Sequence, residues 1–166
     1  MELQDRPILK IKRSWIEIVL DIIGVLSFLS ICAYCIYTWS SLPDQVPMHY
    51  NAKGEIDGWG GRASILIMPF IGVFLWIGLG VLERFPHIHN YSGLTEGNAE
   101  RLYKNSSMMV NVLKNEVVIT FAYFTWKSIQ DAYGNPLYNG VWELPIFLVI
   151  IFGSMAFFII RWFRLR

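Results

Sequence analysis

Four stretches of apolar residues, each about as long as a membrane-spanning helix, dominate the chain. They run over residues 15–39, 63–82, 108–126 and 141–160. Because roughly 20 apolar residues in helical form cross the hydrocarbon core of a bilayer, each stretch is long enough to span it. The pattern predicts an all-α fold: an integral membrane bundle of four transmembrane helices, with residues 1–166 forming a single membrane domain.

The composition excludes several other classes of protein. Apolar residues make up 54% of the chain and charged residues only 16%, whereas about a quarter of the residues of a soluble domain are charged. The chain is too apolar for a disordered protein. A formal net charge of +1 gives no basic surface for binding nucleic acid. We therefore expect membrane lipids around the protein, no nucleic-acid partner and no cofactor.

Basic residues predict the orientation of the spans. Ten of the fourteen Lys and Arg residues precede the first span, separate the second from the third, or follow the fourth. Since cytoplasmic segments retain Lys and Arg, both termini are predicted to be cytoplasmic in a multi-pass protein of the cell membrane. Outer loops are expected at about 40–62 and 127–140, and an inner loop at about 83–107. Six of the seven Trp residues fall near predicted span ends, as amphipathic rings prefer: Trp15, Trp39, Trp59, Trp126, Trp142 and Trp162.

The first outer loop contains a turn signal. Asn51 and Gly54 stand at the first and fourth positions of a type I turn, where Asn bonds its own backbone and Gly takes a positive φ. Residues 47–50 and 55–57 would form the two arms. The sequence therefore predicts a short extracytoplasmic hairpin between the first and second spans.

This loop also contains residues that are candidates for a catalytic or metal site. His49, Glu55 and Asp57 could converge across the hairpin, and a His with two carboxylates can bind a metal or transfer protons. The alternative is that they satisfy backbone groups of the loop. Because a single His is a weak basis for a zinc site, we expect no metal site. A membrane hydrolase working at these three residues is the least favoured function.

The remaining His and Cys residues suggest no further site. His87 and His89 belong to the inner loop, and their spacing does not put them on one helical face, so an ordinary polar loop is expected rather than a metal pair. Cys32 and Cys35 lie inside an apolar span. Free Cys residues there behave as small apolar side chains, so no redox site is expected.

The outer loop resembles a known signature. The run Leu-Pro-x-x-x-Pro-x-His-Tyr-Asn-x-x-Gly-x-x-Asp-Gly-Trp-Gly over residues 42–60 is similar to that of a bacterial and archaeal membrane family of unknown function. The same unit opens SdpI-like antimicrobial-peptide immunity proteins. Pro69 and the inner-loop run over residues 85–103 also resemble the family. The resemblance implies a multi-pass protein of the cytoplasmic membrane that acts in immunity to antimicrobial peptides or in stress signalling.

Ionisable residues inside the spans are a second set of candidates, because charges are costly in hydrocarbon. Asp21 and Lys114 lie at similar depths from the same side, so we expect them to pair between the first and third spans, with Glu17 one turn nearer the cytoplasm and Glu116 close by. Such a pair can align the bundle without further function, or Lys114 can extend its ammonium to the membrane surface. Alternatively, Asp21, Lys114 and Glu116 serve a small transporter or a transporter subunit.

The favoured expectation is a non-enzymatic membrane protein. It would recognise a peptide, a lipid or a membrane-protein partner through its outer loop, and a homo-oligomer is compatible with this expectation. The hairpin would be a rigid platform that offers the contact groups. These are His49, Tyr50, Asn51, Gly54, Asp57 and Trp59.

Overall fold

The structure is a computed structural model that describes residues 3–135 and 141–166. It is mostly helical, with one small antiparallel sheet. The long helices are α1 (Trp15–Thr38), α2 (Ile67–Glu83), α3 (Ala99–Ala132) and α4 (Glu143–Leu165). The strands are β1 (Gln45–Tyr50) and β2 (Ile56–Gly61), and short 3-10 turns occur at η1 (Leu3–Asp5), η2 (Arg62–Leu66) and η3 (Pro86–Ile88).

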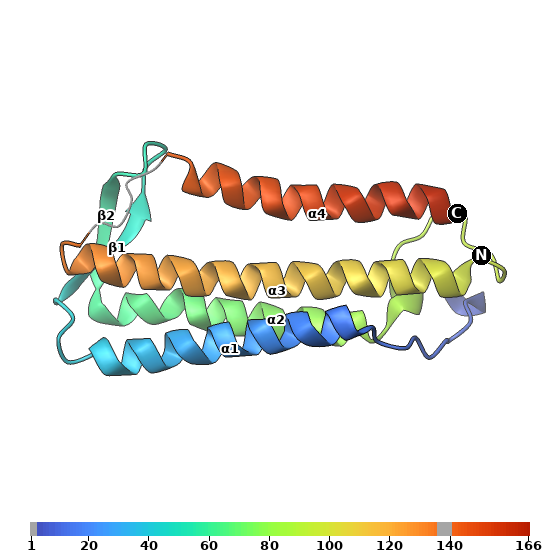
Figure 1. Ribbon diagram of the computed structural model, residues 1–166, viewed down its shortest axis with the longest axis horizontal. Helices are drawn as coiled ribbons and strands as arrows, with labels where there is room; N and C mark the ends of the chain where they lie inside the picture. Colours follow the sequence, from blue (N-terminus) through green and yellow to red (C-terminus); the bar gives the residue numbers. More distant parts are fainter. Residues whose placement is uncertain (1–2, 136–140) are drawn as a thin grey trace.

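Helix α3 lies at the centre of the molecule. It packs against α1, α2 and α4, and Figure 1 shows it between α4 on one side and the α1–α2 pair on the other. Both chain termini lie at one end of the molecule, and β1 and β2 lie at the opposite end. The four helices therefore run lengthwise through the molecule between two polar ends.

Three helical segments are long and apolar enough to cross a membrane: Trp15–Thr38, Arg62–Glu83 and Glu143–Leu165. They match the first, second and fourth predicted spans and indicate a membrane protein. The predicted third span, 108–126, lies within the longer α3, which is not one of these three segments. Its Asn, Ser and Lys residues lower its hydropathy, and they can be placed there because neighbouring helices bury them.

The distribution of apolar and polar side chains is the reverse of that in a soluble protein. Large apolar side chains on α1, α2 and α4 are widely exposed, whereas α3 buries a row of polar ones. Polar groups inside and apolar groups outside suit a protein surrounded by hydrocarbon, where a buried polar group needs a protein partner. The buried polar residues of α3 include Asn105, Ser106, Ser107, Asn111, Lys114 and Asn115.

A capping box starts α1. The Ser14 hydroxyl accepts a hydrogen bond from the Glu17 backbone N–H, while the Glu17 carboxylate accepts one from the Ser14 N–H at 2.5 Å. This arrangement satisfies two of the otherwise unpaired amides at a helix start. Glu17 therefore has a local structural role in addition to any contact inside the membrane.

An apolar core joins the hairpin to the helices. Ile31 and Cys35 of α1 pack with Val46 of β1, Ile65 of η2 and Ile129 of α3. Cys35 is almost fully buried in this core, in keeping with its expected role as a small apolar side chain. The core fixes the hairpin against the helix ends.

The tight turn predicted at Asn51–Gly54 is present. The Gly54 N–H donates to the Asn51 carbonyl at 2.9 Å, and Gly54 has a φ of 78°. The Asn51 side-chain oxygen accepts from the backbone amides of Lys53 and Glu55. Asn and Gly thus serve the turn for the reasons the sequence indicated.

Candidate functional site

The hairpin is held down on the end of α3 by two polar contacts. The Ser128 hydroxyl donates to the Pro47 carbonyl at 2.6 Å, and the Tyr50 hydroxyl donates to Oδ2 of Asp131 at 2.7 Å. Both acceptors are buried. The first strand is therefore docked on the helical bundle and does not project freely.

A pocket of about 450 Å³ lies beneath the hairpin. It is bounded by β1 and the turn, by η2 and the start of α2, by the end of α3 and by the start of α4. Its size is that of pockets that bind small molecules. Apolar lining comes chiefly from Met48, Ile65, Met68, Phe124, Val141, Leu144 and Pro145, and polar lining from His49, Tyr50, Asn51, Ser64, Thr125, Lys127, Ser128 and Glu143.

Lys127 lies between two carboxylates on the polar side of this pocket. Its Nζ is 3.1 Å from Oδ2 of Asp131 and 3.7 Å from Oε2 of Glu143. The same ammonium lies 5.0 Å from the centre of the Tyr50 ring, within range of a cation–π interaction. The Tyr123 hydroxyl donates to Oε1 of Glu143 at 2.9 Å. These contacts tie β1, α3 and α4 together at one point.

Burial raises the pKa of the Tyr50 phenol well above its ordinary value, and the neighbouring Asp131 carboxylate raises it further. Both effects disfavour a phenolate. Tyr50 therefore stays protonated across the physiological range and serves as a hydrogen-bond donor to Asp131.

The structure brings together four of the six contact residues proposed from the sequence. His49, Tyr50, Asn51 and Gly54 line the pocket. Asp57 lies across the hairpin, with Oδ1 2.5 Å from Nδ1 of His49. Trp59 pairs opposite Pro47 on β2, and 55% of its surface is exposed.

Glu55 does not join His49 and Asp57. Its carboxylate accepts a hydrogen bond from the Asn51 side chain at 2.8 Å, and its backbone carbonyl accepts one from the Asn51 N–H. It therefore supports the turn. Within residues 3–135 and 141–166, no group of three or more His, Cys, Asp or Glu residues is placed to hold a metal ion.

The sequence did not point to Lys127, Asp131 or Glu143 as site residues. Lys127 and Asp131 are four residues apart, the spacing that places two side chains on one helical face. That spacing was an available signal, but a polar pair at a helix end usually belongs to a solvated surface. Only the docking of the hairpin shows that the pair is buried.

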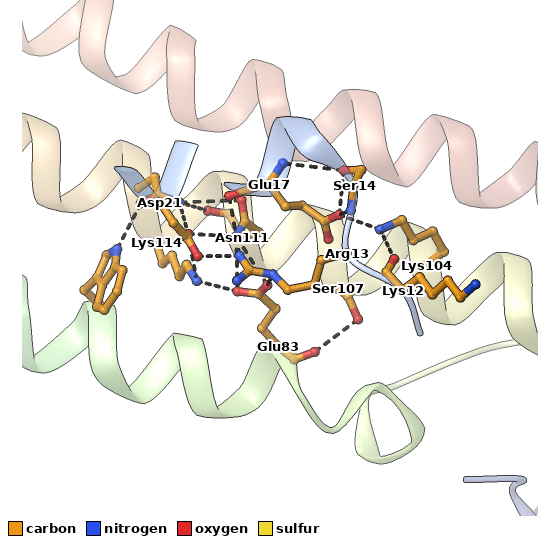
Figure 2. Close-up of polar contacts among 12 residues, drawn as sticks. Lys12, Arg13, Ser14, Glu17, Asp21, Glu83, Lys104, Ser107, Asn111 and Lys114 are labelled. Carbon is orange, nitrogen blue, oxygen red and sulfur yellow. Dashed lines mark hydrogen bonds and ion pairs between the residues drawn. The ribbon is translucent and has the colours of Figure 1, made fainter. Parts of the chain in front are cut away.

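The charges expected to lie inside the membrane form a second site, nearer the end that carries the termini (Figure 1 and Figure 2). Nζ of Lys114 lies 3.0 Å from Oδ1 of Asp21 on α1 and 2.5 Å from Oε2 of Glu83 on α2. The side-chain amides of Asn111 and Asn115 each donate to Oδ1 of Asp21 at 2.9 Å. The expected partners Asp21 and Lys114 are thus in contact, and Glu83 completes a link between three helices.

Two further ion pairs extend this group toward the terminal end. Arg13 contacts the carboxylates of Asp21 and Glu83, and Lys104 contacts that of Glu17. The group contains three acidic and three basic side chains, so its formal charge is zero. They are Glu17, Asp21, Glu83, Arg13, Lys104 and Lys114.

Glu116 lies elsewhere. Its Oε2 accepts a hydrogen bond from the Ser154 hydroxyl on α4 at 2.9 Å, so its carboxylate bridges α3 and α4. One helical turn has 3.6 residues, so Glu116, two positions after Lys114, is on another face of α3. Arg13, Glu83 and Lys104 were the members missed, since Arg13 and Glu83 stand at predicted span boundaries and Lys104 in the predicted inner loop, where a charge is ordinary.

The inner-loop His residues support the chain locally. The Arg6 guanidinium donates to the backbone carbonyls of His87 and His89 at 3.0 and 2.6 Å. The His89 ring lies between the Ser106 hydroxyl, at 2.5 Å, and the Leu82 carbonyl, at 3.0 Å. Burial lowers the pKa of His89 below its ordinary value. In this environment the His89 ring is neutral, and it links α2 to α3.

Comparison with known proteins places the hairpin in a recognised unit. Residues 26–73 match the family described as a domain of unknown function (DUF1648). An uncharacterized protein of Archaeoglobus fulgidus is 45% identical over 38 residues, which cover 23% of this chain and 21% of that protein. This chain thus matches about a fifth of the length of that relative. No solved structure matches the chain. The matched family segment contains the outer-loop run and Pro69, but not the inner-loop run over residues 85–103 that also resembles the family.

Proposed function

We propose that the chain is a four-pass protein of the cell membrane with both termini cytoplasmic. Three apolar segments support the proposal, and α3 would cross as a fourth pass shielded by its neighbours. The two termini lie at one end of the molecule, as an even number of passes requires. The Lys and Arg residues concentrated at that end favour the cytoplasmic side for it.

In this orientation the hairpin and its pocket face the outside of the cell. The protein would recognise an external peptide, lipid or membrane-protein partner at this pocket. The observation that carries the proposal is the pocket of about 450 Å³ beneath the hairpin, where four of the sequence-derived contact residues meet buried charges from α3 and α4. Apolar walls with polar groups placed among them are typical of ligand sites.

We propose recognition rather than catalysis. His49 is the candidate acid–base group, but 72% of its side chain is exposed, and its partner Asp57 does not line the pocket. An exposed His–Asp pair lacks the shielded environment that tunes catalytic groups. The outer-loop run over residues 42–60 resembles that of SdpI-like proteins, and this resemblance makes immunity to antimicrobial peptides, or stress signalling, the favoured biological role.

The charge group around Lys114 favours a structural role over transport. Its three acids and three bases balance, and the Asn side chains of α3 bond to the carboxylates. A charge-balanced, hydrogen-bonded network inside a bundle holds helices together without a transported ion. The transporter alternative therefore has less support than recognition at the outer pocket.

Filling the pocket tests the proposed function. Ala52 lines the pocket and is exposed in the turn, so Ala52→Trp should fill the mouth of the pocket without disturbing the core. Ala63 is also exposed at this end but does not line the pocket, so Ala63→Trp is the matched control. Cells that lack the protein would be challenged with membrane-active peptides and complemented with each variant.

We expect Ala63→Trp to restore resistance and Ala52→Trp to fail, with equal amounts of both proteins in the membrane. His49→Ala should also lose protection at unchanged abundance. Full protection by Ala52→Trp would contradict a function at this pocket. If cells without the protein are as resistant as the wild type, the immunity role is wrong.

A further inference from the structure

The charges beside the outer pocket do not balance. Lys127 supplies one positive charge, and Asp131 and Glu143 supply two negative charges within 4 Å of it. All three groups are largely buried, with side-chain exposures of 7%, 2% and 17%. Residues 136–140, which follow in sequence, contain no charged residue. The cluster therefore has an excess of one carboxylate.

One carboxylate oxygen of this cluster is also unused. Oδ2 of Asp131 accepts from Tyr50 and Lys127, but Oδ1 is buried and accepts no hydrogen bond from the described residues. An unpaired buried carboxylate oxygen costs free energy that a further donor would recover. Asp131 is thus short of one donor. It does not itself line the pocket, whereas Glu143, the second carboxylate beside Lys127, does.

The whole hairpin end has the same sign of charge. Residues 40–62 and 127–145 contain five acidic and three basic residues, and the cluster itself supplies one of the two excess negative charges. The excess negative charge at this end would attract a cation to the pocket mouth and raise its rate of association. The long-range field and the local cluster therefore favour the same kind of ligand.

We propose that the pocket binds an amphipathic cation: an apolar group that carries one amine, presented by an external peptide as a lysine side chain or an amino terminus next to an apolar side chain. This inference rests on the proposed function. The apolar part would pack against Met48, Met68 and Phe124. The ammonium would lie near Glu143 and supply the missing positive charge.

A peptide is favoured over a lipid by the position of the pocket. Ala52 and Gly54 of the turn line it together with the start of α4, so the pocket lies at the hairpin end of the molecule, opposite the termini (Figure 1). The hairpin lies between the apolar segments Trp15–Thr38 and Arg62–Glu83 and belongs to neither, so a peptide in the aqueous phase can reach this part of the pocket. A lipid amine is the alternative, and it becomes an outcome of the test below.

Three probes of nearly equal shape isolate the charge: 4-phenylbutylamine, 4-phenylbutanol and 4-phenylbutyrate. Each would be titrated calorimetrically into the full chain in phosphatidylcholine nanodiscs, with empty nanodiscs as the blank. We expect the amine to bind about tenfold more tightly than the alcohol, as one charge-assisted hydrogen bond allows, and the acid to bind least. Equal affinities for the amine and the alcohol, or no binding of the amine, would overturn the proposal.

Two variants, each lacking one carboxylate, show whether the preference for the amine depends on Glu143. Glu143→Gln keeps the shape of the side chain and its bond to Tyr123, and should weaken amine binding about tenfold while changing alcohol binding less than about twofold. Asp44→Asn removes the same charge from a side chain that is 96% exposed and outside the pocket. It should leave amine binding unchanged. An equal loss in both variants would refute a specific contact with Glu143.

The last comparison distinguishes a peptide from a lipid as the ligand. It also tests cation binding separately from the function of the pocket. A lysine-containing apolar peptide should displace the amine from the wild type in nanodiscs with or without phosphatidylethanolamine. Displacement by phosphatidylethanolamine and not by the peptide would contradict a peptide ligand. If the alcohol binds as well as the amine and Ala52→Trp still loses protection, the cation is wrong but the pocket function stands. If Ala52→Trp protects fully, both are wrong.

Discussion

Lys114 is a buried ammonium whose carboxylate partners come from two other helices. Asp21 lies on α1 and Glu83 at the end of α2, so one side chain links three elements. Loss of one partner of a buried ion pair is far more costly than loss of both, because the remaining charge has to stay buried without compensation. The contribution of Lys114 can therefore be measured with paired substitutions.

Lys114→Met should lower the free energy of unfolding by about 3–5 kcal/mol, since Glu83 then loses its nearest cation. The double variant Lys114→Met with Glu83→Gln should recover most of this loss, because neither charge remains unpaired. Thermal unfolding of the purified protein in detergent measures both. Lys53→Met, a change at an exposed turn, should stay within about 0.5 kcal/mol of the wild type. A double variant that is less stable than Lys114→Met would contradict a compensating pair.

His89 predicts a dependence of stability on pH. Burial holds its pKa in the folded protein below the ordinary value of 6.5. The unfolded chain takes up a proton near that value and the folded chain does so only at lower pH, so this contribution is complete above 6.5 and is lost as the pH falls below it. His89→Gln should flatten the decrease in melting temperature between about pH 7 and pH 5. An unchanged slope would show that His89 does not control it.

The helices differ in how well their sequences predict them. The apolar runs of α1 and α4 place both helices within a few residues of their observed bounds, because long uncharged stretches leave few alternatives. For α3, the expected span of 108–126 captured only the middle of a helix that continues from Ala99 to Ala132. From the sequence, its polar residues indicate a loop or an exposed surface. Only the packing of α1 and α2 against α3 shows that they are buried.

The contact between α1 and α3 depends on a small residue. A Cβ added to Gly24 would lie 2.2 Å from Oδ1 of Asn115, which accepts a hydrogen bond from the Trp76 indole. Gly24→Ala should therefore displace Asn115, destabilise the protein by about 1–3 kcal/mol and change the fluorescence of Trp76. Gly78→Ala adds the same methyl group where no atom lies within 4 Å and should be tolerated. Equal melting temperatures for the two variants would exclude close packing at Gly24.

Over the whole molecule, α1, α2 and α4 have an apolar surface and α3 buries a row of polar side chains, while an apolar core lies beneath the hairpin. The sequence was sufficient to predict the hairpin turn and the pairing of Asp21 with Lys114, because turn chemistry and depth in the membrane are local properties. It could not predict the pocket. That site needs Lys127 and Glu143, from two helices, to meet a hairpin about 80 residues earlier in the chain.

The most direct test of an outward-facing ligand pocket is the labelling of Ala52→Cys in intact cells, in a chain whose Cys32 and Cys35 are replaced by Ala. Ala52 is exposed and lines the pocket. A membrane-impermeant maleimide should label it without permeabilisation, and external 4-phenylbutylamine should slow the labelling. Lys10→Cys, near the other end, should be labelled only after permeabilisation. Labelling of Ala52→Cys only in permeabilised cells, or at a rate that the amine does not change, would contradict the proposed pocket and its orientation.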